Sequence, residues 1–200
     1  MKVRAMGQRA KYGAAIVALA LLAGCISLGG KAPKILLGLT AEKTAAAGTM
    51  TGGKVSDALL VLDPQVERKL DVLRVPVQVD DTRIAYLQDA TWVERPARQF
   101  RHLLAETIRA KGQRLVIEAN DDTSGSKNVL AGRLIDMGYD ARSQSVVLRF
   151  DALREDGKGA VVARRFEAVV PGVSPKAVAV GAALNRAAND VAAQVADWVG

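Results

Sequence analysis

The chain has 200 residues, of which 28 are Lys or Arg, 21 are Asp or Glu, one is His and one is Cys. Four of the basic residues and none of the acidic ones lie in the first 24 positions, so 24 basic residues face 21 acidic ones in the rest, a net charge of only +3. This balance argues against nucleic acid as a partner, and the single cysteine excludes an intramolecular disulfide.

The N-terminal segment has the layout of an export signal. Its basic residues, Lys2, Arg4, Arg9 and Lys11, precede an uncharged run over residues 14–22. This run is well short of the ~20 apolar residues that a bilayer-spanning helix needs. The segment therefore fits a cleavable signal better than a permanent membrane span.

The end of this run carries a lipidation motif. Leu22, Ala23, Gly24 and Cys25 match the lipobox of bacterial lipoproteins, in which the cysteine thiol is alkylated with a diacylglyceryl group and the chain is cut before it. The alternative is an ordinary buried cysteine in an N-terminal hydrophobic helix. We predict a signal peptide over residues 1–24 and lipidation of Cys25, with two or more acyl chains giving a stable membrane anchor.

Residues 25–57 have the composition of a flexible tether. From 26 to 57, 17 of 32 residues are Gly, Ala, Ser or Thr, which have little apolar surface to bury. One apolar stretch, 34–39, is expected to dock on the folded domain or on a partner. We therefore place the folded domain at 58–200.

The domain has the length of a single unit with one core. Apolar or alternating runs predict strands over 58–62, 70–79 and 84–87, and 89–92 is expected to lead into a turn. Pro76, within the second run, indicates an edge strand or a bulge.

A helix is predicted over residues 96–111, with Pro96 in its first turn and Gly112 after its end. An apolar stripe at helical spacing consists of Ala97, Phe100, Leu103, Leu104 and Ile108. The opposite face, expected to be exposed, carries Arg98, Gln99, Arg101, His102, Glu106 and Arg109.

The second half of the domain predicts a meander of strands and a last helix. Strands are expected over 115–118, 128–139, 145–154 and 160–170, with a polar loop at 120–126 and short turns joining the last three. Apolar residues on both sides of the 145–154 strand predict helices over part of both sheet faces.

The last helix is expected to begin with Ser174 as its N-cap and Pro175 in its first turn. Ala177, Gly181, Leu184, Ala188, Val191, Val195 and Trp198 then repeat at helical spacing. The early small residues favour close packing on the sheet. Self-association through this helix fits the same spacing, so a homo-oligomer stays open.

Few residues could carry catalysis. His102 is the only histidine, so any nucleophile and base pair would have to be built around it. Two pairs, Asp80 with Asp81 and Asp121 with Asp122, could serve acid–base chemistry or a hard cation. No third ligand surrounds either pair in the pattern, so solvated turns are the favoured interpretation. We predict no catalytic residue, no cofactor and no metal.

The two tryptophans are expected in the core. Trp92 precedes the first helix, where it could anchor a partner, although packing beneath that helix is the favoured interpretation. Trp198 closes the last helix and is expected to fill the core there.

The order of several motifs resembles one family. They are residues 75–86 (VPVQVDDTRIAY), 89–96 (DATWVERP), 130–136 (LAGRLID), 147–152 (VLRFDA) and 164–167 (RRFE), followed by the last helix with its Asp197 and Trp198. Together with the lipobox, these motifs are similar to the ABC-type transport auxiliary lipoprotein family over roughly residues 58–200.

This resemblance implies an α/β fold, a mixed and largely antiparallel sheet with a three-strand C-terminal meander, flanked by two main helices. It implies a lipoprotein that works beside an MCE-type (mammalian cell entry) periplasmic protein, a permease and an ATPase. Such systems move phospholipids or other hydrophobic molecules between the inner and outer membranes. Ile26 after the cysteine agrees with sorting to the periplasmic face of the outer membrane.

Three functions can be weighed from the sequence. The leading one is a non-catalytic accessory lipoprotein of an MCE-type transporter. The alternative is a lipoprotein regulator of a periplasmic cell-wall enzyme. A third is a hydrolase that uses His102.

Overall fold

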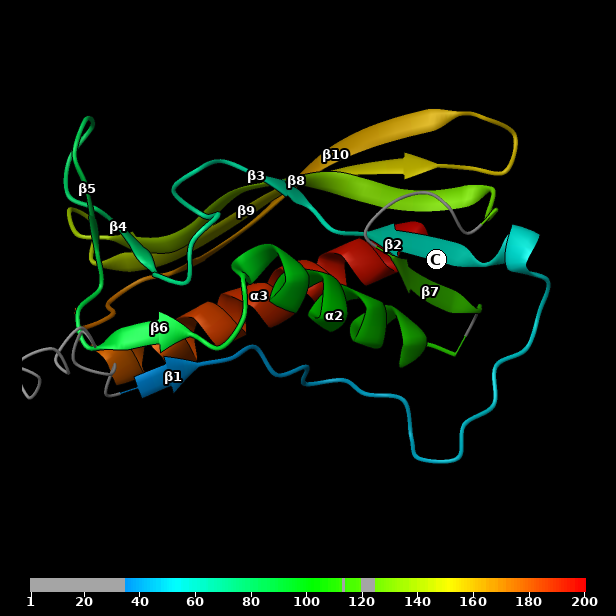
Figure 1. The fold of residues 1–200 in the computed structure, drawn as a ribbon, viewed down its shortest axis with the longest axis horizontal. Helices are drawn as coiled ribbons and strands as arrows, with labels where there is room; N and C mark the ends of the chain where they lie inside the picture. Colours follow the sequence, from blue (N-terminus) through cyan, green and yellow to red (C-terminus); the bar gives the residue numbers. More distant parts are fainter. Residues whose placement is uncertain (1–34, 113, 120–124) are drawn as a thin grey trace, which may run out of the picture. The chain divides into compact units, whose positions relative to one another are not determined.

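Figure 1 shows the computed structural model, which describes residues 35–112, 114–119 and 125–200. In chain order the elements are β1 (Ile35–Leu37), the 3-10 helix η2 (Val55–Asp57), β2 (Leu59–Leu62), β3 (Gln65–Val66), β4 (Pro76–Gln78), β5 (Ile84–Tyr86), β6 (Ala90–Trp92), α2 (Pro96–Arg109), β7 (Val116–Ala119), β8 (Asn128–Asp140), β9 (Ser145–Glu155), β10 (Val161–Val170) and α3 (Ala177–Val199). The predicted signal peptide and Cys25 lie outside the described residues. Within the described part of the chain, neither helix is long and apolar enough to cross a bilayer.

Strand β8 organises the main sheet. Strand β9 pairs antiparallel with β8 from Val129 to Asp140, and β10 pairs antiparallel with the far side of β9. The other edge of β8 is covered in turn by three short parallel strands, β2, β3 and β4. Strand β7 lies beyond β2, and β5 lies beyond β4. The predicted α/β fold, with a mixed, largely antiparallel sheet and a C-terminal meander, is confirmed.

Both helices lie on one face of the meander (Figure 1). Phe150 of β9 and Phe166 of β10 are cross-strand partners on that face. The Phe150 ring meets Phe100 of α2 with centroids 5.2 Å apart, and the Phe166 ring meets Trp198 of α3 at 5.6 Å. The prediction that helices cover part of both faces is therefore wrong. The outer face needs no such cover because its middle residues are charged and pair with one another.

A glycine makes room for the aromatic contact between α2 and the sheet. A Cβ on Gly132 of β8 would lie 2.5 Å from the Phe150 ring and 2.4 Å from the carbonyl oxygen of Asp151. The Phe150 ring therefore lies directly over the β8 backbone. Any larger residue at this position would force the ring or the strand to move.

Residues 35–39 dock on the domain, and residues 40–45 do not form the flexible tether that their composition predicts. Strand β1 pairs in parallel with β6, and Leu37 is buried against α3, where a Cβ on Gly181 would lie 2.6 Å from its side chain. Beyond β1, the backbone N–H groups of Leu39, Thr40, Glu42 and Ala45 donate to Gln99, Asn185, Asn189 and Glu106. The compact unit accordingly includes residues 35–45, so the folded part begins before the predicted boundary at 58. The expectation that the apolar stretch docks on the domain is confirmed for 35–39.

Three local predictions are wrong. The strand predicted over 70–79 is reduced to β4, because the residues before Pro76 fold into turns. The segment 89–92 contains strand β6, because β1 gives it a partner from far back in the sequence. Helix α3 begins at Ala177, so Ser174 and Pro175 precede the helix instead of opening it.

Candidate interaction surface

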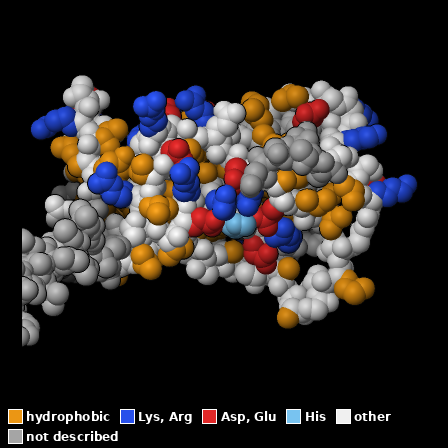
Figure 2. All heavy atoms as spheres, viewed as in Figure 1, with side chains coloured by type: hydrophobic (Ala, Val, Ile, Leu, Met, Phe, Trp, Pro, Cys, Tyr) orange, Lys and Arg blue, Asp and Glu red, His pale blue; other side chains and the backbone are white. Residues whose placement is uncertain are grey.

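His102 lies on α2 within a cluster of charged side chains, seen around the one histidine in Figure 2. Its side chain is 52% exposed, and its Nδ1 lies 2.5 Å from Oε2 of Glu118. The same carboxylate accepts a hydrogen bond from Arg109 at 2.7 Å, and Arg101 lies 3.4 Å from it. Arg101 also pairs with Asp63 at 3.0 Å. Within the described residues, His102 therefore bonds to a carboxylate shared with two arginines and not to a hydroxyl or thiol.

Arg101 and Gln99 of α2 are buried, although the helical pattern places them on the exposed face. Arg101 is 6% exposed and Gln99 is 7% exposed. Arg101 lies against Asp63, which follows β2, and Glu118 of β7. Gln99 accepts the backbone N–H of Leu39. Both side chains are buried because distant segments supply their partners.

Of the two predicted carboxylate pairs, one lies within the described residues and the other does not. Asp80 forms a turn: its Oδ1 accepts the backbone N–H groups of Thr82 at 3.0 Å and Arg83 at 2.9 Å. The Thr82 N–H is the main reason why the pKa of Asp80 lies below its usual value. Asp121 and Asp122 lie outside the described residues. Across 35–112, 114–119 and 125–200, no group of three His, Cys, Asp or Glu side chains is placed to hold a metal ion.

Both tryptophans pack as expected. Trp92 is 1% exposed and belongs to the core beside α2. Trp198 is partly buried and meets the edge of Phe166. Neither side chain is exposed as a partner anchor.

Charged side chains cross the outer face of β8, β9 and β10, on the side away from the helices. Because successive side chains of a strand point to opposite faces, this face receives every second residue. The register arranges six of them in two rows, Arg133, Asp151 and Arg165 in one and Asp136, Arg149 and Glu167 in the other. The sign of the charge alternates along each row and between the rows. We call these six residues the charged band.

Ion pairs join most of the charged band. Arg165 binds Asp151 through two nitrogens, at 2.6 and 2.7 Å. Arg149 bridges Asp136 at 2.7 Å and Glu167 at 2.5 Å. These side chains keep contact with water, and exposed pairs contribute only ~0–1 kcal/mol each to stability. The band is therefore a patterned surface more than a source of stability.

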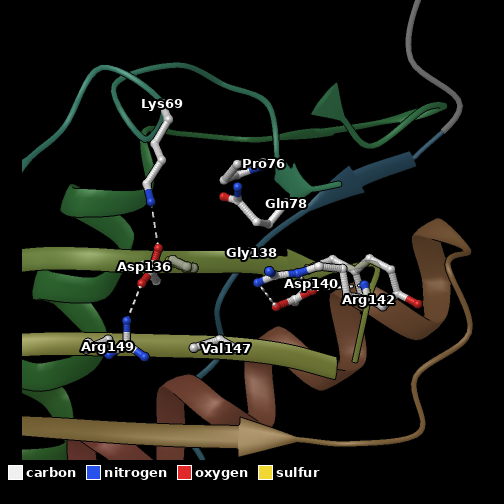
Figure 3. A pocket seen from close by; sticks show the side chains of 11 residues that line it. Lys69, Pro76, Gln78, Asp136, Gly138, Asp140, Arg142, Val147 and Arg149 are labelled. Atoms are coloured by element: carbon white, nitrogen blue, oxygen red, sulfur yellow. Dashed lines mark hydrogen bonds and ion pairs between the residues drawn. The ribbon is translucent and has the colours of Figure 1, made fainter. Parts of the chain in front are cut away.

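A β-bulge brings Asp136 into the band. The pairing of β8 with β9 shifts by one residue between Leu134 and Asp136, so that Arg149 faces Asp136 and not Ile135. Figure 3 shows Asp136 between two cations, Arg149 on β9 and Lys69 from the loop above. The Lys69 Nζ lies 2.6 Å from Asp136 Oδ1. Without the bulge, an isoleucine would lie opposite Arg149.

This end of the band borders a small polar cavity of about 250 Å³. Its lining includes Lys69, Asp136 and Arg149 at one end, Asp140 and Arg142 at the other, and Pro76 and Gln78 of β4 (Figure 3). A Cβ on Gly138 would lie 2.5 Å from the carbonyl oxygen of Pro76, so glycine lets β4 approach β8 here. The cavity is smaller than the ~300–1,000 Å³ of a typical small-molecule site.

Arginines fix the charge of two carboxylates on this surface. The hydrogen bond from the Arg142 side chain lowers the pKa of Asp140. The hydrogen bond from the Arg165 side chain does the same to the pKa of Asp151. A general acid must hold a proton near neutral pH, and these two carboxylates hold none there. Their arrangement suits charge recognition instead of proton transfer.

The charged band could not be read from any single segment. The alternation of Arg149 and Asp151 is visible within one strand, but the rows depend on the pairing of three strands and on the bulge. One feature of the sequence could have indicated the charged band. An Arg and an acidic residue, two or three positions apart, occur in each of three consecutive predicted strands.

A family model described as an ABC-type transport auxiliary lipoprotein component matches residues 39–196. That range includes the main sheet, α2, most of α3 and the whole charged band. No curated protein matches the chain.

Two solved structures share the fold. Protein XCC0632 from Xanthomonas campestris has 19% sequence identity and a TM-score of 0.67, with 82% of this chain and 94% of that chain covered. A second structure, described as an uncharacterized protein, has 15% identity and a TM-score of 0.65, with 84% and 99% covered. At these identities the likeness shows the fold alone.

Proposed function

Because the chain belongs to the ABC-type transport auxiliary lipoprotein component family, we propose that it is the non-catalytic accessory lipoprotein of an MCE-type transporter. In this role it assists a periplasmic MCE protein, a permease and an ATPase in moving phospholipids or other hydrophobic molecules between the inner and outer membranes. The observation that carries the proposal is the family match over residues 39–196.

The geometry of the described surface supports a binding role. The charged band presents paired charges on three neighbouring strands. His102 is engaged with Glu118, which two arginines also approach. A surface of this kind recognises another macromolecule by complementary charge, which gives specificity and rapid association.

Recovery of the partners tests the transporter role. The full-length chain, tagged at its C-terminus, is purified from crosslinked membranes of its own cells, and co-purified proteins are identified by mass spectrometry. We expect the MCE protein together with the permease and ATPase. Repeated recovery of a peptidoglycan synthase without any MCE protein would overturn the proposal in favour of a regulator of cell-wall synthesis.

Lipidation of Cys25 supplies the anchor in this proposal, with the protein on the periplasmic face of the outer membrane. We expect Cys25→Ala to abolish incorporation of labelled palmitate and to release the protein from the membrane fraction. Ser27→Ala, two residues away, serves as the matched control and should leave both unchanged. Density-gradient separation of the two membranes should place the wild-type protein with the outer one; label retained by Cys25→Ala would contradict the anchor.

A further inference from the structure

Strand β10 ends the main sheet with an open edge. It pairs with β9 on one side, and within the described residues no strand covers its other side. The backbone N–H of Asp156 donates to the carbonyl of Ala160 in the turn, which fixes the even-numbered residues of β10 as those bonded to β9. The odd-numbered residues, Val161, Ala163, Arg165, Glu167 and Val169, therefore direct their N–H and C=O groups outward.

This edge lacks most of the features that keep edges from pairing. It is ten residues long, contains no proline and runs beside β9 without a bulge. Val161 is 61% exposed and Val169 is 50% exposed. Natural edge strands are usually short, bulged, covered or charged, and only the last of these applies here. The charged residues of β10 indicate which strand could pair with this open edge.

We propose that β10 pairs antiparallel with β10 of a second copy of this chain, about a two-fold axis at Phe166. In this register Arg165 lies opposite Glu167 of the partner subunit, and Ala163 lies opposite Val169 of the partner subunit. All four residues are odd-numbered, so their outward N–H and C=O groups form hydrogen-bonded pairs. The two meanders become one continuous six-strand sheet.

The charged band selects this register. Across the seam, the row of Arg133, Asp151 and Arg165 continues into the partner's Glu167, Arg149 and Asp136, so that six charges alternate in sign without a break. By symmetry the other row does the same. Opposite charges directly across neighbouring strands stabilise the pairing, and like charges destabilise it.

Neighbouring registers lose this complementarity. A shift that moves the axis to residue 165 places Arg165 opposite the partner's Arg165, and a shift to residue 167 places Glu167 opposite the partner's Glu167. Shifts that pair odd with even residues bring outward-facing groups against inward-facing ones. Among the two-fold pairings centred on the middle of β10, the axis at Phe166 is the one that satisfies both backbone and charge.

Charge reversal tests the proposal on the full-length lipoprotein in detergent, with mass measured by light scattering over a range of dilutions. We expect the wild-type chain to dimerise. Arg165→Glu places two like-charge pairs across the seam, and so does Glu167→Arg, so each variant should dimerise at least about tenfold more weakly. Mixed together, the two variants restore both opposite-charge pairs and should form a heterodimer, recovered through different tags.

The mixing arm separates loss of the interface from loss of the fold, because a misfolded variant cannot be rescued by its complement. A monomeric wild type at all dilutions overturns the proposal, since the edge charges would then only keep β10 soluble. Self-association unchanged by either single variant, or not restored in the mixture, overturns it as well. These outcomes are independent of whether an MCE protein co-purifies.

Disulfide trapping tests the register itself. In the proposed pairing, Ala163→Cys from one copy faces Val169→Cys from another, while neither variant faces itself. We expect a crosslinked dimer under mild oxidation only when the two variants are mixed. A crosslink formed by either variant alone would overturn the register.

Discussion

The charged band and the cluster around Glu118 both contain ion pairs, but in very different surroundings. In the band, the Arg165 and Asp151 side chains are 61% and 36% exposed. In the cluster, the Arg101 side chain is 7% exposed and that of Glu118 is 18% exposed. A buried ion is not hydrated, so removing its partner leaves an uncompensated charge. An exposed ion whose partner is removed is hydrated by water instead. Burial therefore decides how much each ion pair contributes to stability.

The comparison distinguishes ion pairs that hold elements of the fold together from ion pairs that lie on the surface and contribute little to stability. The Glu118 cluster joins α2 to β7 and to the end of β2, and its charges hold these elements together. The alternating signs of the band contribute little to the fold of one copy, so the pattern needs another explanation. Complementarity to a second molecule supplies one. If burial decides the weight of each pair, substitutions should rank in order of burial.

The largest effect is expected for Arg101→Met. Methionine keeps much of the packing but leaves Asp63 and Glu118 short of a cation, so the free energy of unfolding should fall by about 3 kcal/mol. Urea denaturation followed by circular dichroism measures the change. Arg165→Met is the matched exposed control. A loss no larger than that of the control would show that burial does not distinguish the two regions.

An intermediate effect is expected for Asp136→Asn. Asp136 is 28% exposed and pairs with both Lys69 and Arg149, so it lies between the two extremes in burial. We expect a fall of about 1 kcal/mol in the free energy of unfolding, at the upper end for partly exposed pairs. Glu67→Gln, at a more exposed pair with Arg133, should change stability less. The reverse order would contradict a gradient with burial.

Local periodicity was enough to predict the longer elements. Helix α2 and strands β8, β9 and β10 carry their own spacing of apolar residues over ten or more positions, and the structure confirms all four. Strand β6 and the ordered course of residues 40–45 could not be predicted, because their partners lie far away in the sequence. The composition of residues 40–45 predicts flexibility, but asparagine side chains of α3 accept hydrogen bonds from the backbone N–H groups of this segment and hold it in place.

The candidate surface was less predictable than the fold. Each charged residue of the band looks like an ordinary outward residue of its own strand. A one-residue bulge and two strand registers decide which charges meet, and neither leaves a mark in a single segment. Burial of Arg101 could not be predicted either. The helical pattern places it on the exposed face, but in the structure acidic residues from β7 and the end of β2 cover it.

A small effect on stability is expected for Arg165→Met. Both members of its pair with Asp151 are exposed, so the free energy of unfolding should stay close to that of the wild type. The same substitution removes a cation from the proposed seam with the second copy. Denaturation should therefore leave the variant close to wild type, while light scattering should show weaker self-association. A large loss of stability would place Arg165 with the structural pairs.

The smallest effect is the acid dependence that Asp151 brings to the band. Its folded pKa lies below the ordinary value of 3.8, chiefly because of the Arg165 hydrogen bond. The stabilisation is therefore complete above 3.8 and is lost as the pH falls through the lower folded pKa, since the unfolded chain takes up its proton first. From this group the free energy of unfolding should be flat between roughly pH 5 and 7 and should decline below about 4. Asp151→Asn should make that decline shallower in urea denaturation at several pH values, although other carboxylates with lowered pKa, such as Asp140, keep part of it. An equally steep decline in the variant would show that Arg165 does not hold this charge in place.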